Sequence, residues 1–154
     1  MVKNYGIVHN SLIRCIVVTL DNRCMFTGGY DNHLKKWSIK KQELDKDLGG
    51  TIGKGLEDSI LSMCIGNGGK SLFSCSYDGF LKEWSILKGE LVKDWGQVHQ
   101  FDNIKKIVMS VDGEMLFTMG CSGYMKMWKV ANGDLVRDFG QVDDSADVFM
   151  NLLY

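Results

Sequence analysis

The sequence has almost no net charge, no long apolar run and no export signal, and each absence excludes a class of protein. Its 154 residues carry a formal net charge of −1, which provides no field to attract nucleic acid or an anionic membrane. No apolar run reaches the roughly eighteen residues of a membrane helix. The first twenty residues hold too short an apolar part for a signal peptide, and no small-residue cleavage site follows. With 45% apolar residues, we expect a folded chain that binds neither nucleic acid nor membrane.

The sequence also lacks the residue patterns of metal centres, nucleotide sites and catalytic sites. His9, His33 and His99 are not spaced as ligand pairs with one another or with cysteine. The run GNGGKS lacks the first glycine of a phosphate loop, because Cys64 occupies that position. No nucleophile, base and orienting group can be picked out as a set. We therefore expect no metal, no cofactor and no enzymatic activity.

The cysteines do not form a disulfide or zinc-binding pattern. Their number is odd, they include no CxxC pair, and several lie within apolar stretches; they are Cys15, Cys24, Cys64, Cys75 and Cys121. Such cysteines are typical of buried free thiols in a reducing compartment. The expected location is therefore the cytoplasm, or else the nucleus.

What the sequence does contain is one pattern that occurs three times and ends each time near a tryptophan. The three copies are FTGGYDNHLKKWSI (residues 26–39), FSCSYDGFLKEWSI (73–86) and FTMGCSGYMKMWKV (117–130). Their tryptophans, Trp37, Trp84 and Trp128, are separated by steps of 47 and 44 residues. A period in this range indicates a repeat architecture.

Each copy has the pattern of a β-hairpin. A short run of apolar and hydroxyl residues leads into a polar turn and is followed by an alternating run. Gly79 and Gly123 lie where a tight turn needs a positive φ, and Asn32 tolerates that conformation at the same place in the first copy. A largely apolar strand precedes each hairpin, at residues 13–20, 60–65 and 104–109. The sequence therefore predicts an all-β protein.

The spacing within the copies resembles that of the WD-repeat β-propeller family. In that family an Asp in the turn lies six residues before the Trp, as Asp31 and Asp78 do here. The resemblance implies a buried hydrogen-bond chain of His, Ser or Thr, Asp and Trp in each blade. The corresponding residues are His9, Thr27, Asp31 and Trp37 in the first copy, Ser74, Asp78 and Trp84 in the second, and His99, Thr118, Ser122 and Trp128 in the third.

The second and third copies depart from the family pattern. Leu56 replaces the histidine of the second copy. In the third copy His99 is one residue out of place, and Ser122 stands where the family has Asp. We therefore expect the first copy to hold the only complete hydrogen-bond chain and to be the best fixed of the three.

The resemblance also implies the domain organisation, which is a single partial propeller over residues 1–154. We expect three four-stranded antiparallel sheets in an open arc, with blades at 9–48, 56–96 and 99–140. Residues 1–8 would form the outer strand of a preceding blade, and residues 147–154 the first strand of a further one.

An open arc would leave one sheet face uncovered at each end. We expect apolar side chains to line these faces, namely Ile16, Val18 and Phe26 at one end and Ile107, Met109 and Phe117 at the other. Exposed apolar patches of this size are unusual on soluble monomers. Further blades from the same longer polypeptide or from another chain would cover the faces; otherwise we expect a homo-oligomer.

For function, the resemblance implies a non-catalytic protein–protein interaction scaffold or adaptor, as a segment of a larger propeller. A regulatory or substrate-recruiting subunit of a catalytic assembly, with the chemistry on another chain, remains an open alternative. Tyrosine is favoured at interaction sites because it combines a large rigid area with a polar tip. The partner-binding candidates are the tyrosines before the turn aspartates and the polar residues around the first strand: Tyr30, Tyr77, Asn10, Ser11 and Arg14.

We predict that Asp31→Ala lowers the free energy of unfolding more than Ser122→Ala does. Removing one partner from a buried polar chain costs about 1–3 kcal/mol, and more where a charge is involved. Denaturant titrations of the two variants test this, and equal midpoints would contradict it.

Overall fold

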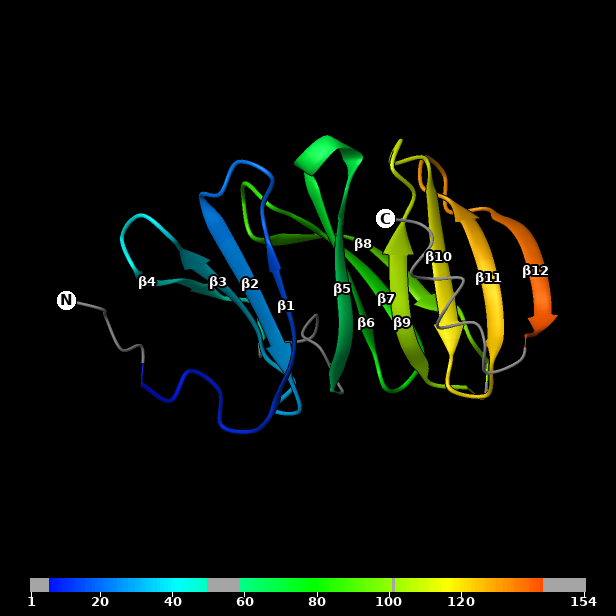
Figure 1. Cartoon of the computed structure of the whole chain (residues 1–154), viewed down its shortest axis with the longest axis horizontal. Coiled ribbons are helices and arrows are strands. Elements are labelled where there is room, and N and C mark those ends of the chain that lie inside the picture. Colours follow the sequence, from blue (N-terminus) through cyan, green and yellow to red (C-terminus); the bar gives the residue numbers. More distant parts are fainter. Residues whose placement is uncertain (1–5, 50–58, 101, 143–154) are drawn as a thin grey trace.

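The structure is a computed structural model that describes residues 6–49, 59–100 and 102–142. In this part of the chain three four-stranded antiparallel sheets stand side by side, which confirms the all-β prediction (Figure 1). A single-turn 3-10 helix, Asn67–Gly69, joins two strands of the second sheet. We call the sheets blade 1, blade 2 and blade 3 in chain order.

The strands of each blade follow the chain order, so neighbours in sequence are also neighbours in the sheet. Their bounds are β1 Ile13–Val18, β2 Cys24–Gly29, β3 Leu34–Ser38 and β4 Glu43–Asp47 in blade 1, β5 Ile60–Gly66, β6 Ser71–Ser76, β7 Phe80–Ser85 and β8 Glu90–Gln97 in blade 2, and β9 Ile104–Met109, β10 Met115–Gly120, β11 Tyr124–Lys129 and β12 Leu135–Gln141 in blade 3.

The blades are in contact through their first strands. Strand β5 lies between β1 and β9, while β4 and β12 lie far apart at the two sides of the molecule (Figure 1). Burial follows this arrangement: every residue of β6, in the middle blade, is buried, and every residue of β4 is exposed. The two larger hydrophobic clusters therefore form layers between neighbouring blades, and a third, smaller cluster lies on the other face of blade 3.

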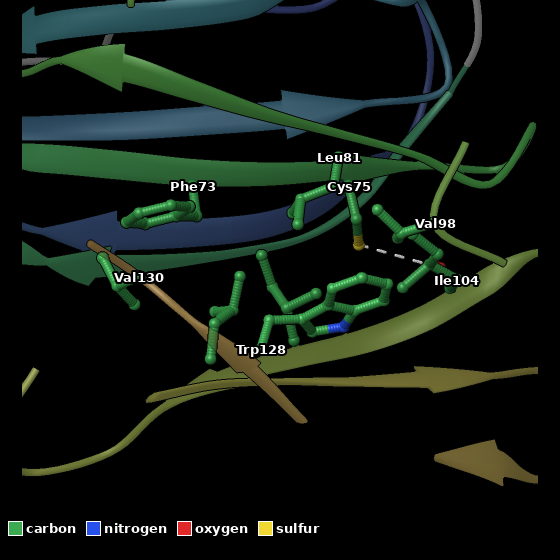
Figure 2. Close-up of a cluster of buried hydrophobic side chains, with 9 residues drawn as sticks. Phe73, Cys75, Leu81, Val98, Ile104, Trp128 and Val130 are labelled. Carbon is green, nitrogen blue, oxygen red and sulfur yellow. Dashed lines mark hydrogen bonds between the residues drawn. The ribbon is translucent and has the colours of Figure 1, made fainter. Parts of the chain in front are cut away.

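The two core layers are built in the same way. Between blades 1 and 2, Phe26 of β2 packs in one cluster with Trp84 of β7. Between blades 2 and 3, Phe73 of β6 shares a cluster with Trp128 of β11, and Leu81 and Ile104 fill the same layer (Figure 2). In both layers the face of a blade that carries its tryptophan covers the phenylalanine face of the blade before it.

The hairpin turns have the backbone conformation that the sequence predicts. Asn32, Gly79 and Gly123 have φ values of 64°, 83° and 83°. At Gly79 a side chain is also excluded by space, because a Cβ atom would lie 2.8 Å from the carbonyl oxygen of His99. The turn of blade 2 therefore packs directly on the link that leads into blade 3.

Three apolar residues were predicted to line the uncovered end face of blade 1, and the structure confirms two of them. Ile16 and Val18 are 62% and 44% exposed, as expected, but Phe26 is fully buried. Side chains alternate between the faces of a strand, and directly paired residues share a face. Phe26 pairs with Val17, so it points away from Ile16 and toward blade 2.

The same alternation of side chains also corrects the prediction for the end face of blade 3. Ile107 is only 2% exposed and lies, with Met109 beside it, in the layer between blades 2 and 3. Phe117 pairs with Val108 and packs in a separate cluster on the opposite face of blade 3. Of the three residues assigned to this end, only Phe117 belongs to the outer face.

The predicted terminal strands are not tested as a whole. Residues 1–5 and 147–154 lie outside the described residues, and residues 6–8 are not in a strand. Leu56, the expected replacement for a histidine, also lies outside them.

We predict that Phe26→Ala lowers the free energy of unfolding by about 3–5 kcal/mol, because it opens a cavity between two blades. Ile16→Ala, on the next strand but on the exposed face, should cost about 0.5 kcal/mol or less. Guanidinium titration followed by tryptophan fluorescence measures both, and equal losses would show that the faces are assigned wrongly.

Candidate protein-interaction face

A chain of hydrogen bonds fixes the loop before β1 to the β2–β3 turn of blade 1. The Nδ1 atom of His9 lies 2.8 Å from a carboxylate oxygen of Asp31, and its Nε2 atom lies 2.7 Å from Oγ1 of Thr27. The indole N–H of Trp37 donates to the same hydroxyl oxygen at 2.9 Å. The consistent assignment is that His9 donates from Nδ1 to the carboxylate and accepts the Thr27 hydroxyl proton at Nε2. All four residues implied by the resemblance are therefore in contact.

Asp31 also holds the loop through the main chain. Its carboxylate accepts the backbone N–H groups of Asn10 at 2.9 Å and His33 at 3.2 Å. Partial burial alone would raise the pKa of Asp31, but the hydrogen bonds from His9, Asn10 and His33 lower it below its ordinary value. The carboxylate is thus held ionised where it joins loop and turn.

Blade 2 keeps only part of this chain. The indole N–H of Trp84 donates to Oγ of Ser74 at 2.8 Å, in the same way as in blade 1. Asp78, however, accepts the hydroxyl of Ser76 and so stabilises its own turn. Among the contacts of the described residues, Asp78 does not extend the hydrogen bond between Trp84 and Ser74.

Blade 3 is more complete than the sequence predicted, because His99 does reach its partner. Its Nε2 atom lies 2.8 Å from Oγ1 of Thr118, and the indole N–H of Trp128 donates to that oxygen at 2.9 Å. The extra residue between His99 and Ile104 is taken up by the loop, so the imidazole keeps its place. The prediction that His99 is out of place is therefore wrong for this contact, whereas the four-member chain that includes a turn aspartate is found in blade 1 among the described residues.

The carboxylate missing from the blade 3 turn is supplied by Asp102, which the sequence analysis did not single out. Asp102 accepts the backbone N–H and the hydroxyl of Ser122, both at 3.1 Å. In blade 1 an acid of the turn binds the loop; in blade 3 an acid of the loop binds the turn. A Cβ at Gly120 would lie only 1.8 Å from this carboxylate, so glycine is required there. The sequence did contain a signal for this role, because the segment from His99 to Ile104 is one residue longer than the segment from His9 to Ile13.

His99 is buried, with 2% of its surface exposed. Burial lowers the pKa of His99 below its ordinary value, and the nearby ammonium of Lys126 lowers it further, against smaller opposing effects of Asp102 and Asp138. The imidazole is therefore neutral near pH 7.

The tyrosines predicted to bind a partner, Tyr30 and Tyr77, belong to the β2–β3 and β6–β7 turns. Both turns lie at the lower edge of the molecule in Figure 1. Tyr30 and Tyr77 are 41% and 51% exposed. The backbone N–H of Tyr30 donates to the Leu12 carbonyl at 3.0 Å, and that of Tyr77 to the Ser59 carbonyl at 2.9 Å. Each tyrosine therefore stands on a turn that is hydrogen-bonded to the loop before the first strand of its own blade.

The other candidates surround Tyr30. The guanidinium of Arg14 lies 5.3 Å from the centre of the Tyr30 ring, and Asn10 and Ser11 are exposed on the adjoining loop. The sequence analysis missed Leu12 on the same loop, although it is 67% exposed. Tyr77 belongs to the neighbouring blade. The structure thus places an apolar residue, a cation and two tyrosines along one edge; we call Leu12, Arg14, Tyr30 and Tyr77 the tyrosine face.

The cysteine thiols lack the features of reactive nucleophiles. Burial raises the pKa of Cys15 and that of Cys64 to about 12. Cys121 is exposed, but partial burial and the nearby carboxylate of Asp102 raise its pKa as well. Within residues 6–49, 59–100 and 102–142, no cluster of His, Cys, Asp and Glu is arranged to hold a metal ion. In the same segments no helix has the length and apolar character needed to cross a membrane.

The fold and the repeated Trp–hydroxyl bonds are those of propeller blades, and comparison with known proteins agrees. Residues 4–38 and 49–85 match the family model "WD domain, G-beta repeat". These two segments are therefore WD repeats, and the fold is that of the WD-repeat propellers, as the resemblance indicated.

Solved propeller structures resemble the chain in shape. A structure described as U3-55K has a TM-score of 0.80 at 22% identity, and one described as RRP9 WD40 repeats has a TM-score of 0.78 at 22% identity. They align with 88% and 84% of this chain, which spans only 41% and 39% of their lengths. A comparison with curated proteins gave no match. As 1309 solved chains match, likeness of shape shows the fold and not the partner.

We predict that Asp102→Ala lowers the free energy of unfolding by about 0.5–1.5 kcal/mol, because the backbone N–H of Ser122 exchanges a carboxylate acceptor for water. Ser122→Ala keeps that main-chain contact and should cost less. Thermal and urea unfolding of both variants test this prediction; a Ser122→Ala loss as large as that of Asp102→Ala would show that the carboxylate has no anchoring role.

His99 should make the protein less stable as the pH falls from 7 to 5. In that range the unfolded chain takes up a proton at the ordinary histidine pKa of about 6.5, whereas folded His99 stays neutral to lower pH. The unfolded state therefore binds more protons, and stability is lost on acidification. His99→Gln should reduce the loss of stability between pH 7 and pH 5. Both proteins retain His9 and His33, so the difference between them reports on His99. Identical plots of unfolding free energy against pH would show that the pKa of folded His99 is not lowered.

Proposed function

We propose that the chain is a non-catalytic protein-interaction scaffold or adaptor, and that it binds its partner on the tyrosine face. The observation that carries this proposal is the pair of half-exposed tyrosines on neighbouring blades, with Arg14 and the exposed Leu12 beside Tyr30. Rings of this kind bury a large area at a small cost in conformational entropy.

The rigidity of the support favours the same function. Tyr30 follows a strand whose turn is held by Asp31, His9 and the backbone of Asn10. A side chain on such a turn is already close to one position before a partner arrives. Less ordering entropy then opposes binding, and more of the contact energy remains as affinity.

We further propose that these three blades belong to a larger propeller. The chain covers about two fifths of the solved propellers that it matches. Ile16 and Val18 are exposed on the end face of blade 1, where the repeated packing in the rest of the molecule would place a phenylalanine face. Blades from the same longer polypeptide or from a second chain would cover it, and otherwise a second copy of this chain would.

The chemistry of the site supports binding more than catalysis. WD-repeat folds are in general interaction domains, and the exposed polar groups of the tyrosine face include no aligned nucleophile and base. All five cysteines are free thiols, which supports a reducing location, the cytoplasm or the nucleus. Among the described residues, no contact favours the alternative of a regulatory or substrate-recruiting subunit of a catalytic assembly.

Affinity capture with matched variants tests the interaction proposal. The unchanged chain, the double variant Tyr30→Ala/Tyr77→Ala and the control Val111→Ser are compared; Val111 is 94% exposed on the β9–β10 loop, at the opposite edge from the tyrosine face. Proteins that the double variant loses at least tenfold and the control retains would identify the partner. Equal recovery by all three chains would refute the tyrosine face as the binding site.

A further inference from the structure

A second cavity, separate from the tyrosine face, lies between the outer parts of blades 2 and 3. It has a volume of about 690 Å³ and is bordered by β8 on one side and by β11 and β12 on the other. Another space between blades 1 and 2, bordered by the end of β4, Trp84 and the start of β8, measures about 240 Å³. A volume near 700 Å³ is within the usual range of ligand sites. We call this cavity the inter-blade cleft.

Aromatic side chains form much of its wall. Trp95 projects from β8, and Tyr124 and Trp128 project from β11. Trp128 is nearly buried and fixed by its bond to Thr118, whereas Tyr124 is 43% exposed. The chain's own cations already lie near two of these rings, Lys93 at 4.5 Å from Trp95 and Lys126 at 5.9 Å from Trp128. Tyr124 therefore offers the most accessible ring to a ligand.

The charges in the cleft are unbalanced toward the negative. Asp102 and Asp138 contribute two carboxylates, and Lys126 contributes one ammonium group. Lys126 donates to the Val98 carbonyl at 3.1 Å and lies 3.9 Å from the Asp138 carboxylate. His99 is neutral near pH 7, as shown above, so it adds no positive charge. Lys93 lies over the Trp95 ring but is not among the lining residues, so the lining groups by themselves favour a cation.

We propose that the inter-blade cleft binds an arginine side chain of a partner peptide. A guanidinium group is planar, so it stacks on a ring such as that of Tyr124 while its N–H groups donate to a carboxylate. Asp138 accepts one main-chain N–H, from Gly140, and its side chain is 48% exposed, which leaves lone pairs for a ligand. Lysine fits less well, because its ammonium is a point charge that cannot stack and donate in this paired manner.

The smaller space between blades 1 and 2 provides an internal comparison. Blade 1 repeats the ion pair of blade 3, with Lys35 3.8 Å from the carboxylate of Asp47. That space has Trp84 as its only lining aromatic residue among the described side chains. The Lys35–Asp47 pair therefore matches the Lys126–Asp138 pair, but the space that Asp47 borders has one aromatic residue where the cleft has three, so Asp47 serves as a control for Asp138.

The indole N–H signals of the full chain provide the readout. The sequence contains four tryptophans, and two of them, Trp95 and Trp128, line the cleft while Trp37 and Trp84 lie elsewhere. The ¹⁵N-labelled chain is titrated with the tripeptides acetyl-Gly-Arg-Gly-amide, acetyl-Gly-Lys-Gly-amide and acetyl-Gly-Glu-Gly-amide. We expect saturable shifts of the Trp95 and Trp128 signals, strongest for the arginine peptide, with Trp37 unchanged.

Two variants locate the effect. Asp138→Asn should raise the Kd of the arginine peptide at least fivefold, and Tyr124→Leu at least threefold, whereas Asp47→Asn should leave it unchanged. The dispersion of the four indole signals shows that each variant is folded. An equal response to the glutamate peptide, equal shifts of all four indoles, or equal effects of Asp138→Asn and Asp47→Asn would overturn the proposal. Loss of binding to the tyrosine face in the capture experiment would not affect it, because the two sites share no residue.

Discussion

The tryptophan that each blade bonds to a hydroxyl of its own second strand is the contact on which the rest of the structure depends, and in blades 2 and 3 its ring also packs against the preceding blade. Trp37, Trp84 and Trp128 are between 2% and 9% exposed, and each donates its indole N–H to a threonine or serine hydroxyl of the neighbouring strand. A large ring buried with its N–H unpaired would carry a desolvation penalty, so the hydroxyl fixes both the ring's orientation and the register of β2 with β3 and of its counterparts. Once that register is set, side-chain alternation decides which face of every blade carries the phenylalanine that the next tryptophan covers.

Blades 1 and 3 differ in the residue that joins the loop before the first strand to the hairpin turn. The loop before the first strand must be joined to the hairpin turn, and a carboxylate does this twice from opposite sides: Asp31 reaches from the turn to the loop, and Asp102 reaches from the loop to the turn. Both give an exposed backbone N–H group an ionic acceptor, which is the stronger kind of hydrogen bond. The position of the acid in the sequence is therefore less constrained than the place of its oxygens in space, and this freedom explains why blade 3 tolerates a serine in its turn.

The strands, turns and blade order could be predicted from the sequence because they depend on spacing, which a linear pattern records. Asn32, Gly79 and Gly123 take the positive φ expected of them, and β9 has the predicted bounds. The missed features depend on register and on loop path, which the pattern does not record. The assignment of Phe26 to an outer face failed because its partner is Val17 and not Ile16. Asp102 was missed because its role appears only when the loop after His99 is seen folded over the turn. The tyrosine face was recognised from residue type, but the cleft was not, since its walls come from two blades.

The differences between the blades indicate where binding can arise. Residues needed by the fold recur in all three: the tryptophan, its hydroxyl partner and the lysine two positions before the tryptophan, Lys35, Lys82 and Lys126. Residues that differ at equivalent positions are not required for the packing of a blade. Tyr30 and Tyr77 correspond to Cys121, and the exposed Tyr124 corresponds to His33 and Phe80. Each proposed site combines one such differing position with recurring residues: in the cleft, Tyr124 stands beside Lys126, Trp128 and Asp138, which recur in the other blades. A rigid repeated frame therefore lets each surface position change at little cost to stability, which is the condition under which one blade can acquire a ligand that its neighbours do not bind.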